Sequence, residues 1–249
     1  DNKLVFEIEE SVRSTKDMGE DELESFKILH WLIYFCWNIG IFKPLLKYAN
    51  IELNINPMNI LLQILETKNN KLKDLFYSME NESISEWFDT KEDLIDYYKD
   101  DENRNRLKEF RKLNVWWIAK LYSDNTLLND LYDEIVFFVE NNFAKKDFND
   151  IVWNELKNIN LQLLCFGDLS KSGKSDPISI HGKTIYYLNG DKEYVDKSNI
   201  KINIYRDEES AQWWDYYLDG ESYSNVPINK FLSALEKGGS SKLLNSIAV

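Results

Sequence analysis

Residues 26–65 read FKILHWLIYFCWNIGIFKPLLKYANIELNINPMNILLQIL, a dense apolar and aromatic stretch of the 249-residue chain. The run from residue 28 to residue 42 is about 15 residues long, whereas a helix that spans a bilayer needs roughly 20. We therefore expect a buried core helix here and no membrane span. The side chains expected to be buried are those of Trp31, Phe35, Cys36 and Phe42.

The helix boundaries follow from the prolines, glycines and asparagines of the sequence. Residues 21–48 are expected to form one long helix or two helices broken near Gly40 and Pro44, because glycine lowers helix propensity and proline lacks a backbone donor. Asn56 followed by Pro57 predicts the start of the next helix, which runs to about residue 66. Further helices are expected at residues 71–79, 83–88, 91–98, 102–122, 126–142, 147–166, 208–218 and 227–237.

Upstream of the helices, residues 4–11 read LVFEIEES and alternate between apolar and polar side chains, which is the period of a β-strand. A long helical region separates this strand from the next strand-like sequence, so its partners are either distant or lie upstream. The start Asp-Asn-Lys, with no initiator Met, favours the second alternative. An unpaired edge from Leu4 to Glu9 would then promote association with a second chain.

Three residues are candidates for side chains that face a pocket. Glu7 and Glu9 share one face of the N-terminal strand, and carboxylates at the end of a barrel strand commonly face a ligand. His30 is the third candidate, although its position beside Trp31 on an apolar face is more typical of a packed core histidine.

The composition changes at Gly167, where GDLSKSGKSDP predicts a solvated loop. The segments ISIHGKTIYYLNGDKEYVD and IKINIY follow, and turn residues at His181-Gly182 and Asn189-Gly190 predict a small meander of strands. The fold class is therefore α+β and predominantly α-helical. We expect a strand and linker at residues 1–20, a helical domain at 21–166, and a small α+β region with two helices and a polar tail at 167–249.

The net charge of −13 argues against nucleic acid as a partner, because it repels a phosphate backbone. The two cysteines, Cys36 and Cys165, both lie in apolar runs and are typical of buried reduced thiols in a cytoplasmic protein.

The chemical motifs of the sequence assign no catalytic, cofactor-binding or metal-binding residue. Five residues separate Gly167 from Gly173, whereas a phosphate-binding P-loop requires four, and Pro177 would cut short the helix that must follow. The chain has only two histidines, and neither has a second strong ligand at helical spacing. The two distant cysteines do not supply the three thiolates that a radical-forming iron–sulfur cluster needs.

The run from LVFEIEES through FKILHWLIYFCWNIGIFKPLLKYA to NINPMNILLQIL resembles the C-terminal region of cobalamin-binding radical S-adenosylmethionine proteins. This group includes the anaerobic magnesium-protoporphyrin monomethyl ester cyclases and many methyltransferases. The resemblance covers residues 4–65, and WFDTKEDLIDYY and KLNVWWIAKLY are compatible with it. The cluster-binding Cys-x-x-x-Cys-x-x-Cys motif of the family does not occur in this sequence.

The resemblance implies the C-terminal part of a radical-generating, iron–sulfur oxidoreductase or methyltransferase. This part would shape the substrate pocket, would not catalyse alone and would carry no cofactor itself. An iron–sulfur cluster, S-adenosylmethionine and cobalamin are implied for the parent protein, whose upstream barrel and cobalamin domain would be the partners. The alternative is a self-standing acidic helical module that docks a protein partner through its aromatic residues.

Overall fold

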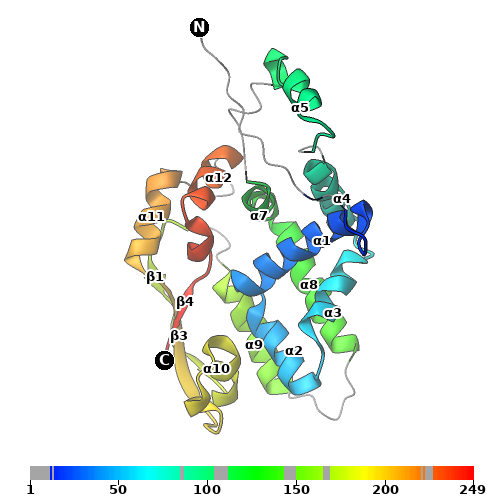
Figure 1. Cartoon of the computed structure of the whole chain (residues 1–249). Coiled ribbons are helices and arrows are strands. Elements are labelled where there is room, and N and C mark those ends of the chain that lie inside the picture. Colours follow the sequence, from blue (N-terminus) through cyan, green and yellow to red (C-terminus); the bar gives the residue numbers. More distant parts are fainter. Residues whose placement is uncertain are drawn as a thin grey trace.

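The computed structural model describes residues 12, 14–84, 87–103, 112–142, 150–164, 169–219, 221 and 227–249. Helices make up most of this part, and a small antiparallel sheet lies beside them (Figure 1), so the α+β, predominantly helical fold class is confirmed. The strand expected from Leu4 to Glu9, its unpaired edge, and Cys165 lie outside the described residues.

The apolar stretch that opens the chain forms three consecutive elements. Helix α1 (Glu20–Ile33) continues into the π-helix η1 (Tyr34–Asn38), and α2 (Lys43–Leu53) follows after a turn that contains Gly40. Pro44 lies in the first turn of α2, where a backbone N–H has no acceptor within the helix, so proline breaks no helical hydrogen bond there. The second of the two sequence alternatives, a broken helix, is therefore correct.

The two halves of this broken helix are also the part of the described chain that bears on a membrane span. In the part of the chain that the structure describes, no single helix has the length and apolar character to cross a membrane. The pair Ser25–Asn38 and Lys43–Leu53 meets those criteria only when taken together, and it is bent by 90°.

The helices that begin with a capping residue start close to their predicted positions. Helix α3 (Pro57–Leu65) begins at Asn56, whose side chain accepts a hydrogen bond of 2.9 Å from the backbone N–H of Met58. Helix α5 (Lys91–Tyr97) begins at Thr90, which accepts from the N–H of Asp93. The remaining long helices are α4 (Asn70–Ile84), α7 (Leu113–Ser123), α8 (Asn125–Asn141), α9 (Asp150–Leu163), α11 (Glu208–Leu218) and α12 (Ile228–Glu236).

The predicted meander is wrong in part, because GKTIYYLN forms helix α10 (Gly182–Asn189). The His181 side chain caps its N-terminus, and Glu155 of α9 accepts hydrogen bonds from the His181 N–H and the Thr184 hydroxyl. Gly190 ends the helix in the left-handed conformation that glycine adopts without steric cost. The two turn signals of the sequence are thus the two caps of one helix.

The sheet has β3 (Ile200–Arg206) at its centre. Strands β1 (Gly173–Lys174) and β2 (Ile178–Ile180) pair with it antiparallel, and so does β4 (Ser246–Ala248), as Figure 1 shows. The expected polar tail is therefore also wrong, since the 3₁₀ helix η3 (Gly239–Lys242) and β4 occupy that segment. A second 3₁₀ helix, η2 (Lys192–Tyr194), precedes β3.

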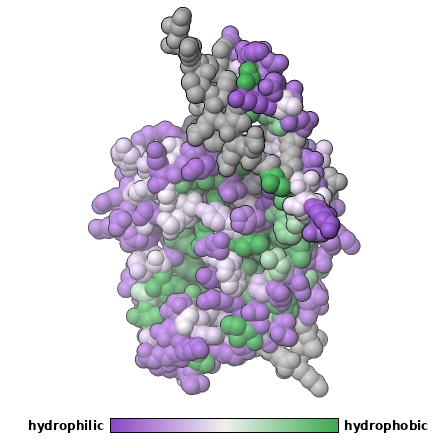
Figure 2. Space-filling view, viewed as in Figure 1, coloured by the Kyte–Doolittle hydropathy of each residue, from purple (hydrophilic) through white to green (hydrophobic). Residues whose placement is uncertain are grey.

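One large core joins the N-terminal helices to the C-terminal ones. Trp31, Phe35, Cys36 and Phe42 are all at most 1% exposed, which confirms their predicted burial. Trp214 of α11 and Phe231 of α12 belong to the same core, so it extends across the composition change at residue 167. A smaller core of isoleucines and one leucine lies between α9, α10 and the sheet. Figure 2 shows hydrophobic residues gathered toward the middle of one face, within a hydrophilic rim.

Candidate functional site

A hollow of about 990 Å³ opens between segments that are far apart in the sequence. Its walls are α1 with η1, the first turns of α7, and the end of α12 with η3, which lie near one another in Figure 1. Ser83 of α4 also lines it. This volume is in the range of small-molecule pockets, roughly 300–1,000 Å³. The hollow is therefore a candidate ligand site.

The wall from α1 and η1 carries a polar stripe. Lys27, His30, Tyr34 and Asn38 all line the hollow, at successive spacings of three, four and four residues. Side chains three or four residues apart share one face of a helix. The stripe therefore faces the hollow, while the intervening apolar residues of the same run face the core.

The end of this stripe lies on a π-helix. The backbone N–H of Ile39 donates to the carbonyl of Tyr34 at 2.9 Å, a bond that spans five residues instead of the usual four. Single π-turns within helices are rare and occur frequently at functional sites. Here both the first and the last residue of the π-helix line the hollow.

Several polar side chains of the hollow have no partner among the described residues. Within the part of the chain that the structure describes, the side chains of His30, Tyr34 and Asn38 form no hydrogen bond or ion pair. The same is true, among the described residues, of Asn114 and Ser240 on the opposite walls. These groups are thus available to a bound molecule.

The floor of the hollow is held rigidly by tryptophans. The Trp31 Nε1–H donates to the backbone carbonyl of Asn114 at 3.1 Å, which ties α1 to the first turn of α7. Trp117 is 2% exposed, and its Nε1–H donates to Glu82 at 2.8 Å. The two indole rings meet edge to face with centroids 6.2 Å apart. These contacts tie the α1 wall of the hollow to the α7 wall.

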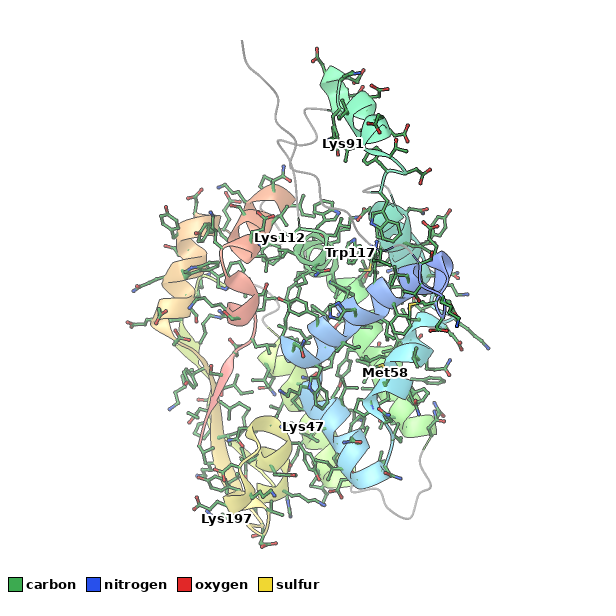
Figure 3. The ribbon with its side chains drawn as sticks, in the orientation of Figure 1. Lys47, Met58, Lys91, Lys112, Trp117 and Lys197 are labelled. Carbon is green, nitrogen blue, oxygen red and sulfur yellow. The ribbon has the colours of Figure 1, made fainter. Side chains whose placement is uncertain are left out.

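The charged groups of the hollow are mostly basic. Among the described residues, Lys27 and Lys112 line it, against one carboxylate, that of Glu236. The Lys27 ammonium lies 3.3 Å from the centroid of the Trp87 ring. Figure 3 shows Lys112 at the start of α7 and Trp117 further along the same helix. The hollow is therefore locally basic, although the net charge of the whole chain is −13.

The residues predicted from the sequence fall in different places. His30 is exposed and lines the hollow, so the interpretation as a packed core histidine is wrong. The reason is that His30 lies on the polar stripe of α1, and Trp31 on its apolar face. Glu7 and Glu9 lie outside the described residues.

Sequence reasoning missed the residues that reach the hollow from other segments, such as Lys112, Asn114 and Ser240. No local pattern marks them, because only the packing of α7 and η3 against α1 brings them together. The stripe itself left a signal, since the polar side chains of FKILHWLIYFCWN recur at helical spacing.

The loop that is close to a P-loop in sequence has a different structure. Gly173 and Lys174 form β1 and pair with Arg206 and Tyr205 of β3, and the N–H of Ser175 donates to the Ile204 carbonyl. These backbone groups are therefore used by the sheet. Among the described residues, no group of three or more His, Cys, Asp or Glu side chains could hold a metal ion.

A second polar cluster links α2 to α10. The Glu52 carboxylate accepts hydrogen bonds from Lys183 at 2.7 Å and from the Tyr187 hydroxyl. Burial opposes ionisation of Glu52, but these bonds hold its pKa below the ordinary value. Burial, and then the bond to Glu52, raises the pKa of Tyr187. All the groups are satisfied, so the cluster fastens the two helices together.

No family model, no curated protein and no solved structure matches this chain.

Proposed function

We propose that this chain is the C-terminal, accessory portion of an iron–sulfur radical S-adenosylmethionine protein, an oxidoreductase or methyltransferase that also uses cobalamin. In this proposal it works in the cytoplasm beside an upstream barrel and a cobalamin domain of the same polypeptide. The cofactors belong to those upstream parts. This chain contributes one side of the substrate pocket and performs no chemistry alone.

The observation that carries the proposal is the hollow and the position of its polar stripe. The stripe lies on α1 and η1, inside the stretch whose sequence resembles the family. An accessory region that shapes a pocket needs polar groups without internal partners, held on a rigid support. His30 and Asn38 are such groups, and the tryptophan floor is such a support.

The upstream coding sequence gives the first test. We expect the reading frame to continue upstream for several hundred codons and to encode Cys-x-x-x-Cys-x-x-Cys. A gene that starts near Asp1 would contradict the proposal and leave the acidic interaction module as the better hypothesis.

The second test uses the full-length protein, purified without oxygen. His30→Ala should lower kcat/KM on the order of tenfold, as expected when one polar substrate contact is lost, and should leave the iron content unchanged. The matched control is His181→Asn, because the second histidine lies on α10 and asparagine preserves its capping role. Unchanged turnover in the His30 variant would exclude a role of the hollow in catalysis.

A further inference from the structure

We infer that the hollow binds an organic anion, a molecule with a carboxylate or phosphate group attached to an apolar body. This inference rests on the proposed function, because it names the substrate class of the same site. It is drawn from the charges, the unpartnered donors and the mixed lining of the hollow.

The charges of the lining favour an anion over a cation or a neutral molecule. Lys112 and Lys27 contribute positive charges. Among the described residues of the lining, Glu236 is the one carboxylate. Charge-assisted hydrogen bonds to carboxylate or phosphate are about twice as strong as neutral ones.

The unpartnered groups of the hollow can all donate hydrogen bonds. Lysine only donates, and histidine donates from a ring nitrogen, while the amides of Asn38 and Asn114 each offer two N–H groups. In the described residues the Lys112 side chain forms no hydrogen bond or ion pair. An acceptor-rich head group satisfies these donors together. The positive end of the α7 dipole lies on the same wall and adds to the attraction.

The apolar lining and the volume argue that the ligand is more than an inorganic ion. Ile39, Leu113, Val115 and Leu235 also line the hollow, beside the Tyr34 ring. If a bare phosphate were bound in a hollow of about 990 Å³, these apolar side chains would still face water. A ligand with an apolar body covers them and gains the free energy of their burial.

The chain offers a direct spectroscopic test, since His30 and His181 are its only histidines. Their ring resonances can be followed by NMR while three probes are added: phenyl phosphate, phenol and inorganic phosphate. Phenyl phosphate should shift the His30 resonances saturably and leave those of His181 unchanged. Phenol and inorganic phosphate, which each supply half of the ligand, should bind on the order of tenfold more weakly or worse.

Lys112→Glu reverses one charge of the hollow and should weaken phenyl phosphate binding on the order of tenfold or more. The matched control is Lys91→Glu, the same change at an exposed lysine on α5, which does not line the hollow and lies apart from Lys112 in Figure 3. This control should bind as the parent chain does. Equal unfolding midpoints of the two variants would show that Lys112→Glu acts on binding and leaves the fold intact.

The outcomes separate this inference from the proposed function. No saturable shift of His30, equal binding of phenol and phenyl phosphate, or equal effects of the two lysine variants would each overturn the anion site. If the upstream cysteine motif is found but His30 does not respond, only the ligand class is wrong. If His30 responds but no upstream motif exists, only the accessory role is wrong.

Discussion

Trp31 and Phe26 lie on the same helix but differ in what they contribute to stability. Trp31 is 1% exposed and stacks on Phe35 with ring centroids 5.2 Å apart, whereas Phe26 is 52% exposed. Trp31→Ala should therefore lower the free energy of unfolding by about 3–5 kcal/mol. Phe26→Ala is the matched control and should cost less than about 1 kcal/mol. Denaturant titration measures both, and similar values for the two variants would contradict the buried position of Trp31.

Gly182 lies where no larger residue fits. A Cβ atom added there would lie 2.0 Å from the carbonyl oxygen of Tyr194 and 2.4 Å from that of Lys197. Both contacts are with backbone, which cannot turn aside as a side chain could. Gly182→Ala should lower the free energy of unfolding by about 1–3 kcal/mol. Gly173→Ala, where nothing lies within 4 Å, should leave stability nearly unchanged in the same thermal melts.

At the scale of elements, the bond between α2 and α10 makes stability depend on pH. The folded-state pKa of Glu52 is held below its ordinary value. The ionised Glu52 therefore contributes its full share of folding stability above about pH 4, the ordinary glutamate range. That contribution is lost as the pH falls through the lowered folded-state pKa. Glu52→Gln should cost about 1–2 kcal/mol at pH 7 and should flatten the loss of stability on acidification.

Unfolding free energies of both chains between pH 7 and pH 3 check this expectation. Glu92→Gln on α5 is the control, because Glu92 is exposed and should leave the acid limb of the curve in place. An acid limb equally steep in the parent chain and in Glu52→Gln would assign the pH dependence to other carboxylates.

Elements with local signals were predictable, and those that depend on distant contacts were not. The starts of α3 and α5 follow from Asn56 and Thr90, because a capping side chain bonds to its own helix. Helix α10 is an exception, because its caps at His181 and Gly190 are local but also suit hairpin turns, and its contact with Glu155 of α9 lies 26 residues upstream of His181. Strand β4 was missed because it forms by pairing with β3, which lies about forty residues away in the sequence.

The candidate site follows the same division. The sequence offered His30 as a pocket residue but favoured a core position, since an isolated histidine in an apolar run has no visible partner. Its role depends on Lys112 and Ser240, which reach the hollow only through the packing of α7 and η3. The carboxylates Glu7 and Glu9 remain predictions.

At the scale of the whole molecule, the helical and C-terminal segments share one core. Phe231 of α12 is 1% exposed and packs between Trp214 of α11 and Tyr122 of α7, with ring centroids 5.5 and 6.2 Å away. The two segments should therefore unfold together. Tryptophan fluorescence and the His181 NMR signal should give one common midpoint in denaturant. Two separate midpoints would show that the segments are independent.

The π-helix at Tyr34–Asn38 places one more residue in its turn than an α-helix would. The wider turn absorbs that residue, so the helix before it keeps its direction. Deleting one residue within the π-helix would therefore restore ordinary winding and leave Lys27 and His30 facing the hollow. Deleting one residue between His30 and Tyr34, where the winding is already α-helical, would instead turn Lys27 and His30 by about 100° relative to the residues that follow. The chain should therefore tolerate a change of length in η1 better than one at the end of α1.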